Sequence, residues 1–140
     1  MSEEPRTPDL VTLGRQAREA MSRGDVDAVM GLFAPDAVYD LSDGGLGTFE
    51  GKEAIRRFFE DWHRSYEDYR FEEEELLDLG HGVGLGVVRE SARLVGGKGR
   101  VELLAAQVSI WANGKVEWLK AYPDPDEARA AAERLAKERG

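Results

Sequence analysis

The sequence contains no cysteine, which excludes disulfide bonds, thiolate nucleophiles and cysteine-ligated metal or iron–sulfur sites. Its two histidines, His63 and His81, are too few for a histidine metal cluster. No apolar run approaches the roughly 18 residues of a membrane-spanning helix, and the acidic start lacks the apolar stretch of a signal peptide. We therefore expect a soluble cytoplasmic protein.

The sequence also has few positive charges: 19 Lys and Arg stand against 28 Asp and Glu, which gives a net charge of −9. Such a surface repels phosphate backbones and anionic lipids, so neither nucleic acid nor a membrane is an expected partner. What remains is a chain of 140 residues, 41% hydrophobic and 34% charged, which suits one globular domain.

Helical spacing and capping residues predict four helices. After a disordered stretch over residues 1–6, Thr7 and Pro8 supply the cap and first residue of a helix that ends at Gly24. Asp25 caps a second, short helix that continues through Phe33 and is stopped by Pro35. The strongest helical period covers residues 52–66, and a capping box at residues 124–127 opens a last helix over 126–137.

Alternating patterns predict the strands. A short strand over residues 37–41 precedes a glycine-rich loop, residues 42–47, which lacks the lysine and the spacing of a phosphate-binding loop. A four-stranded meander follows over residues 70–79, 83–94, 100–112 and 115–122, and Asn113-Gly114 is a strong two-residue turn signal. This order of elements predicts an α+β fold with helices packed against one face of a curved sheet.

Several segments resemble the nuclear transport factor 2-like superfamily. The stretches Arg23–Ala28 and Leu32–Val38 resemble its opening, Phe49–Phe59 is similar to its SnoaL-like branch, and Gly114–Val116 with Tyr122 fits its last hairpin. The resemblance spans residues 10–122. It implies a cone-shaped antiparallel sheet wrapped by three N-terminal helices around a pocket, as in ketosteroid isomerases and polyketide cyclases. The cone domain would cover residues 7–125, followed by a C-terminal helix over 126–140, and the meander would form a homodimer interface.

The resemblance also allows a test of the ketosteroid isomerase residues. That enzyme requires a tyrosine, a carboxylate base and a protonated aspartate. Counted along this chain, the three positions fall on Ala17, Leu41 and Gln107. Two of the three are chemically inert, which excludes a steroid isomerase in the strict sense. Gln107 still provides a hydrogen-bond donor for a carbonyl oxygen.

Three residues are candidate general bases. Asp40 and Asp43 flank Leu41, and a bulge or loop shift would bring either carboxylate into the cone mouth, where burial raises a carboxyl pKa. In the alternative interpretation, Asp40 points outward and Asp43 initiates the turn. His63 follows Trp62 at the margin of the third helix and either overhangs the pocket or is partly exposed.

Other activities of the family find weaker support. A cyclase-type aspartate is missing from residues 100–122, which contain only Glu102 and Glu117 as carboxylates. Arg100 and Glu102 could serve the Asp-Arg-Asp arrangement of epoxide hydrolases, although a solvated pair explains them as well. Arg89 either faces the cone as an oxyanion or carboxylate partner, or is an exposed arginine.

A pocket wall would be built from apolar and aromatic side chains, with core packing as the alternative for many of them. Trp111 and Trp118 flank the last turn and are candidates for a cross-strand pair. The run 72–75, four glutamates, is expected on a solvated face or a protected edge. The candidate substrate-binding residues are Tyr39, Leu41, Phe59, Trp62, Arg89, Trp111, Trp118 and Tyr122.

The leading hypothesis is a cofactor-free protein that binds a small apolar, carbonyl-bearing molecule. Asp40 or Asp43 would act as base in an isomerase- or cyclase-type proton transfer, with Gln107 as hydrogen-bond donor. No metal or organic cofactor is expected, because the sequence offers neither a ligand cluster nor a nucleotide loop. The alternative is a non-catalytic ligand-binding or dimerisation module of the same fold.

Overall fold

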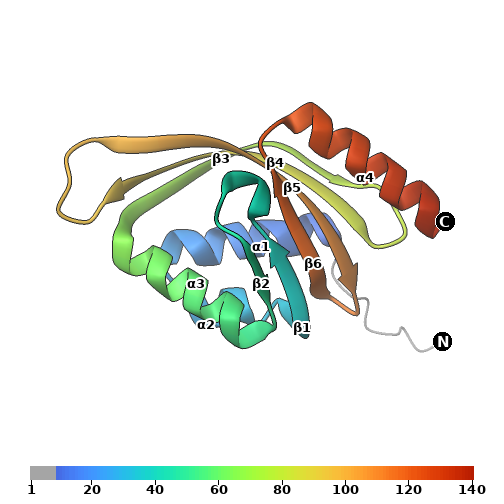
Figure 1. Ribbon diagram of the computed structural model, residues 1–140, viewed down its shortest axis with the longest axis horizontal. Helices are drawn as coiled ribbons and strands as arrows, with labels where there is room; N and C mark the ends of the chain where they lie inside the picture. Colours follow the sequence, from blue (N-terminus) through green and yellow to red (C-terminus); the bar gives the residue numbers. More distant parts are fainter. Residues whose placement is uncertain (1–8) are drawn as a thin grey trace, which may run out of the picture.

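A six-stranded curved sheet organises residues 9–140, the part of the chain described by the computed structural model (Figure 1). Its strand order is β2-β1-β6-β5-β4-β3, and all neighbours are antiparallel except β1 and β6, which run parallel. The strands are β1 Phe33–Asp40, β2 Thr48–Glu50, β3 Tyr66–Asp78, β4 Val83–Leu94, β5 Arg100–Ala112 and β6 Lys115–Tyr122. The helices are α1 Leu10–Arg23, α2 Val26–Met30, α3 Lys52–Ser65 and α4 Pro125–Arg139, with a 3-10 turn η1 at Ser42–Gly44. The predicted α+β fold is confirmed.

The helix boundaries follow local capping chemistry. Asp9 caps α1 by accepting a hydrogen bond from the Thr12 amide at 2.8 Å. The predicted cap at Thr7 and Pro8, like the disordered stretch 1–6, lies outside the described residues. Gly24 ends α1 in the left-handed conformation, and Asp25 caps α2 through the Ala28 amide, both as predicted.

The prediction for residues 31–36 was wrong. The second helix ends at Met30, and Phe33 and Pro35 belong to β1. Pro35 is tolerated there because it falls at a register irregularity between Phe33 and Val38, where β1 and β6 have no paired residues. Strand β2 and turn η1 were not predicted, since three-residue elements carry too little periodicity.

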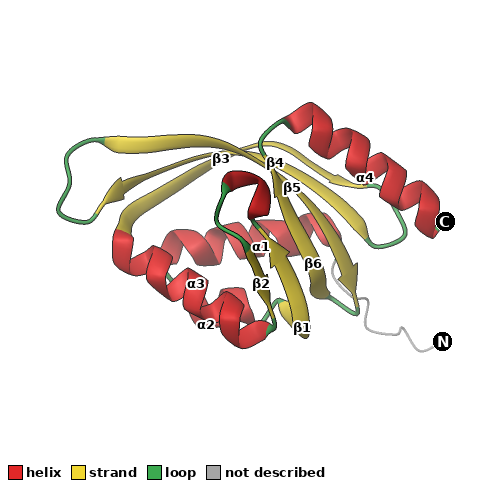
Figure 2. Cartoon of the chain, viewed as in Figure 1, coloured by secondary structure: helices red, strands yellow, loops and turns green. Residues whose placement is uncertain are grey.

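Helices cover both faces of the sheet (Figure 2). Helices α1, α2 and α3 pack on the concave face around a core that includes Met30, Ile55 and Phe59. Helix α4 lies on the opposite face, where three alanines, Ala128, Ala132 and Ala136, are buried against β4 and β5. The expectation of helices on one face therefore holds only for α1–α3. The homodimer remains a prediction. Helix α4 covers part of the meander face that was expected to form the dimer interface.

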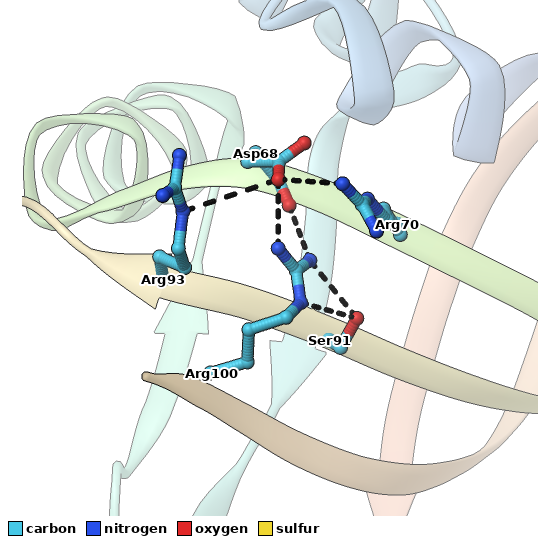
Figure 3. Close-up of polar contacts among 5 residues, drawn as sticks. All are labelled: Asp68, Arg70, Ser91, Arg93 and Arg100. Carbon is cyan, nitrogen blue, oxygen red and sulfur yellow. Dashed lines mark hydrogen bonds and ion pairs between the residues drawn. The ribbon is translucent and has the colours of Figure 1, made fainter. Parts of the chain in front are cut away.

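Strand β3 contains two bulges that decide which of its side chains face inward. The first lies between Glu67 and Arg70, where Asp68 adopts a positive φ of 53°. Figure 3 shows Asp68 between Arg70 and Arg93, with Arg100 reaching both Asp68 and Ser91. The hydrogen bond from Arg100, at 2.7 Å, is the main reason that the pKa of Asp68 is lowered. These contacts hold the bulge to β4 and β5.

The second bulge lies within the acidic run, between Glu73 and Glu75. Instead of lying together on one solvated face, the glutamates form ion pairs with three different elements. Glu73 pairs with Arg15 of α1, Glu74 with Arg89 of β4, and Glu75 with Arg129 of α4. Each pair is partly exposed and adds little stability by itself, but together they connect the bulge to both layers of helices.

No helix among residues 9–140 is long and apolar enough to cross a membrane.

Two glycines of the β3–β4 turn provide a test of the observed register. Gly82 has a φ of 80°, and a Cβ atom there would lie 2.5 Å from the Trp111 carbonyl oxygen of β5. Gly80 has a φ of 86° with open space around it. We expect Gly80→Ala to lower the free energy of unfolding by about 1–2 kcal/mol, because alanine is strained in this left-handed backbone conformation. Gly82→Ala should cost at least about 2 kcal/mol more, because it also strains the β4–β5 contact. Urea denaturation measures both, and equal losses would contradict the register.

Candidate functional site

The concave face of the sheet and helices α1 and α3 enclose a cavity of about 500 Å³. Its wall is mostly apolar. Six of the residues expected to bind substrate line it: Tyr39, Leu41, Phe59, Trp62, Trp111 and Tyr122. On β4 the inward positions are Gly84, Gly86, Val88 and Glu90, so this strand presents little bulk and one carboxylate to the cavity. The volume is in the range typical of small-molecule sites.

A hydrogen-bonded polar cluster interrupts this apolar wall. Arg18 of α1 donates to Glu90 of β4 and, at 2.7 Å, to the side-chain oxygen of Gln107 of β5. Tyr69 of β3 donates to Glu90 Oε1 at 2.6 Å. Gln107 Nε2 donates to the Tyr39 hydroxyl of β1 at 3.1 Å. Five side chains from one helix and four strands thus form one connected network, which we call the polar cluster.

The fold explains why these five groups meet. Glu90 lies between Phe71 and Leu103 in the sheet, with its side chain on the concave face, and α1 crosses that face close enough for Arg18 to reach it. Tyr69 faces inward because the first β3 bulge adds one residue just before it, which reverses the alternation of side chains. The cluster therefore depends on tertiary register rather than on any contiguous motif.

Burial and charge set the protonation states of the polar cluster. Burial, the largest single influence, would lower the pKa of Arg18, but the negative charge of Glu90 together with the contacts to Tyr69 and Tyr39 outweighs it, and the pKa is raised. Burial raises the pKa of Tyr39 to about 12, and it also raises the pKa of Tyr69. At neutral pH the cluster therefore contains a charged guanidinium and two neutral phenols.

The hydrogen-bonding positions of the polar cluster that remain unused within residues 9–140 include an acceptor on Glu90 and a donor on Tyr39. Both hydrogen bonds to the Glu90 carboxylate end on Oε1, while Oε2 has no partner and stays accessible. The Tyr39 hydroxyl accepts from Gln107 but donates to no other group. Both residues line the cavity, so the polar cluster retains an acceptor and a donor on residues of its wall.

The predicted bases Asp40 and Asp43 do not line the cavity. Asp40 Oδ1 accepts hydrogen bonds from the Ser42 hydroxyl at 2.5 Å and the Ser42 amide at 2.9 Å, and these lower the pKa of Asp40. Lys120 Nζ lies 3.8 Å from Asp40 Oδ2 and 3.9 Å from Asp43 Oδ2. In this geometry both carboxylates hold the loop after β1.

His63 also lies away from the cavity lining. It packs beside Gly24, the C-cap of α1, with its Nε2 atom buried and without a hydrogen-bond partner in the described part of the chain. Burial lowers the pKa of His63, which favours the neutral ring at pH 7. This arrangement indicates a packing role at the α1–α3 junction.

Arg89 and its neighbour Glu90 occupy opposite faces of β4. Arg89 points away from the cavity and donates to Glu74 at 2.8 Å, whereas Glu90 faces inward. Of the two positions left open for Arg89, the exposed one is observed, and the inward side chain is that of its neighbour Glu90. Gln107 lines the cavity as expected, although its carbonyl group is already bonded to Arg18.

The two tryptophans of the last hairpin do not form the expected pair. A register shift between Ile110 and Trp111 places Trp111 opposite Val116 and Trp118 opposite Ile110. Trp111 consequently lines the cavity, while Trp118 packs on the other face with the core beneath α4. The bulge, which leaves no pattern in the sequence, is the reason for the difference.

Sequence reasoning did not identify Arg18 or Tyr69 as site residues. For Glu90 the sequence does carry a signal. Val83, Leu85 and Val87 lie on one face of β4 and alternate with the residues of the other face, so Arg89 and Glu90 fall on opposite faces of the strand. That pattern separates Glu90 from Arg89 but does not show which face is concave. For Arg18 and Tyr69 the sequence carries no comparable signal, since their partners lie 72 and 21 residues away.

The sequence profile of the SnoaL-like domain matches residues 15–117. The chain belongs to this family. A search of curated proteins gave no match. The predicted resemblance is thus confirmed, and the match covers α1 through the start of β6, including every residue of the polar cluster.

Solved structures with the nuclear transport factor 2-like fold are similar to this SnoaL-like chain. An NTF2-like protein of unknown function from Burkholderia pseudomallei is 22% identical, with a TM-score of 0.70 over 86% of this chain and 95% of that one. An LEH-like epoxide hydrolase of M. tuberculosis is 15% identical, with a TM-score of 0.72 over 93% of each chain. A putative isomerase from Bacillus subtilis is 15% identical, with a TM-score of 0.73 over 88% and 91%. At these identities the likeness establishes the fold alone.

Replacing Arg18 tests whether the polar cluster is a coupled buried network. In Arg18→Met the carboxylate of Glu90, with 14% of its side chain exposed, loses its positive partner. We expect a loss of about 3 kcal/mol in the free energy of unfolding, measured by urea denaturation. Arg15→Met is the matched control, because the exposed Arg15–Glu73 pair should contribute less than about 1 kcal/mol. Similar losses in the two variants would show that the Arg18–Glu90 pair is not specially coupled.

Proposed function

We propose that this SnoaL-like protein binds a small, mainly apolar molecule with one carbonyl group and catalyses a cofactor-free proton transfer next to that carbonyl. The observation that carries this proposal is the hydrogen-bonded polar cluster on the wall of a mostly apolar cavity of about 500 Å³. Such a site buries the hydrocarbon part of a ligand and fixes its orientation through one polar group.

The unused donor of Tyr39 suits the carbonyl oxygen. With a pKa of about 12, Tyr39 stays protonated well above neutral pH and donates a neutral hydrogen bond. Gln107 donates to the same hydroxyl at 3.1 Å and so orients it. When charge develops on the carbonyl oxygen, this donor strengthens its interaction without any rearrangement.

The unused acceptor, Glu90 Oε2, suits the role of general base. The base would take a proton from the carbon next to the carbonyl, so that a C–H bond breaks and an O–H bond forms on Glu90. The electron pair of the C–H bond passes to the carbonyl oxygen, which gives an enolate held by Tyr39. Return of the proton to the same carbon gives exchange; in a substrate with a C=C bond next to that carbon, return of the proton to the far carbon of the double bond shifts the double bond and completes an isomerisation. Asp40 and Asp43, the bases first expected, have no access to the cavity wall in this scheme.

Binding without catalysis is the second candidate function. It is favoured by the two hydrogen bonds that Glu90 Oε1 already receives, from Arg18 and Tyr69, because these bonds hold the carboxylate in place as a structural partner of α1 and β3. The printed names of the neighbours, an epoxide hydrolase and a putative isomerase among them, are compatible with acid–base chemistry in this fold and do not decide between the two functions.

The Tyr39 hydroxyl should determine the preference for a carbonyl group. We expect wild-type protein to bind linear methyl ketones more tightly than alkanes of the same length, and Tyr39→Phe to lose about tenfold in ketone affinity only. Titration calorimetry measures both ligand series. Tyr66→Phe is the control, because Tyr66 stacks on Trp62 and does not line the cavity. Equal ketone and alkane affinities in the wild type would refute the carbonyl site.

Glu90 should separate catalysis from binding. In heavy water, wild-type protein is expected to accelerate deuterium exchange at the carbons next to the carbonyl of a bound methyl ketone, as followed by NMR. Glu90→Gln keeps the shape of the side chain and should lower this rate by at least about 100-fold, while ketone affinity changes little. Glu73→Gln, at a partly exposed carboxylate on the cavity edge, is the control. Ketone binding without exchange in the wild type would establish the binding-only function.

A further inference from the structure

Leu76 of β3 belongs to the part of the cavity wall formed by the edge strand. It is half-buried and lines the cavity, and it lies opposite Gly86 of β4. Gly86 in turn lies opposite Gln107 of β5, so that Gln107, Gly86 and Leu76 form one row across three strands. At the usual strand spacing, Leu76 starts about 10 Å from the polar cluster residue Gln107.

Two glycines on different elements leave room for this one side chain. A Cβ atom on Gly14 of α1 would lie 3.4 Å from Leu76 Cδ1, and one on Gly86 would lie 3.5 Å from the same methyl group. Both are ordinary van der Waals distances, so the Leu76 side chain fills the space between α1 and β4 in direct contact with the two glycine positions. We call this space the glycine notch, defined by Gly14 and Gly86.

The second β3 bulge is the reason that a leucine fills the glycine notch. The bulge between Glu73 and Glu75 shifts the alternation by one residue, which directs Leu76 to the concave face. The ion pairs of Glu73 with Arg15 and of Glu75 with Arg129 fix this register from both layers of helices. Arg15 directly follows Gly14, so the same contact also holds α1 against β3 at the notch.

We propose that Leu76 determines the maximum size of the ligand. With leucine present, the glycine notch is filled and the ligand tail ends against the two methyl groups. A smaller side chain at this position would open the notch to the tail, and a larger one would shorten the cavity. The proposal rests on the proposed function, because it treats the polar cluster as the anchor for the carbonyl end.

Two ligand series test this size limit. The first is a set of linear methyl ketones from hexanone to dodecanone, which engages the polar cluster. The second is a set of linear alkylbenzenes from toluene to hexylbenzene, which carries no polar group and reports cavity size alone. Affinities are measured by titration calorimetry for the wild type, Leu76→Ala and Leu76→Phe.

The two substitutions should shift the length dependence in opposite directions. In the wild type, affinity should rise about fourfold for each added methylene until the tail reaches Leu76, and then stop rising. Leu76→Ala should extend this rise by about two methylenes, because it removes three carbon atoms at the tail end. Leu76→Phe should end the rise at a shorter tail. General loss of folding cannot produce an extension, so the alanine variant remains decisive even if it is less stable.

Leu79→Ala is the matched control. It removes the same atoms close by in the chain, but Leu79 packs with the core beneath α4 and does not line the cavity. Its length dependence should equal that of the wild type. If Leu76→Ala and Leu79→Ala both keep the wild-type limit, the proposal for Leu76 is overturned.

The two series also separate this proposal from the proposed function. If alkylbenzenes show the expected shifts while ketones bind no better than alkanes, the size limit stands and the carbonyl site is refuted. If ketones bind through Tyr39 but neither series shifts with Leu76, the proposed function stands and the size limit is refuted. If the wild type binds neither series, both proposals are overturned.

Discussion

The register of strand β3 is the constraint on which the site depends. Each of its two bulges adds one residue, and each addition reverses which side chains face the cavity. The first brings Tyr69 to the polar cluster, and the second brings Leu76 to the glycine notch. Charged residues at the bulges, Asp68 in one and Glu73 to Glu75 in the other, are bound by arginines of α1, β4, β5 and α4. Pairs that add little stability individually thus fix the composition of the cavity wall.

The Arg18–Glu90 pair stabilises the fold no better than a hydrophobic pair at the same position would. Removing two charges from water costs several kcal/mol, and a hydrophobic pair of similar volume often stabilises a protein as well or better. The polar cluster meets the cost through shared hydrogen bonds that include Tyr69 and Gln107. A network that is satisfied on one side and open at Glu90 Oε2 and Tyr39 on the other is the arrangement expected of a binding site.

The fold was predictable from the sequence because its signals are local. The period of residues 52–66, the Asn113-Gly114 turn and the caps at Asp25 and Asp124 each specify an element from a few neighbouring residues. The site was only partly predictable because its geometry is not local. Six of the expected wall residues and Gln107 line the cavity, but the inward face of β4 and the bulges of β3 and β6 follow from sheet pairing. For that reason Arg89 and Trp118 were candidates for the cavity wall although both lie on the other face of the sheet.

The position of β6 has a consequence for how the chain folds. Strand β6 lies between β1 and β5, so residues near position 38 must pair with residues near position 118. Contacts across such a separation slow folding, because a long loop must close before they are made. Until β6 has been synthesised, the β1–β2–α3 unit and the β3–β4–β5 meander have no strand to join them. The step that joins these two parts of the sheet is therefore also the step that creates the cavity.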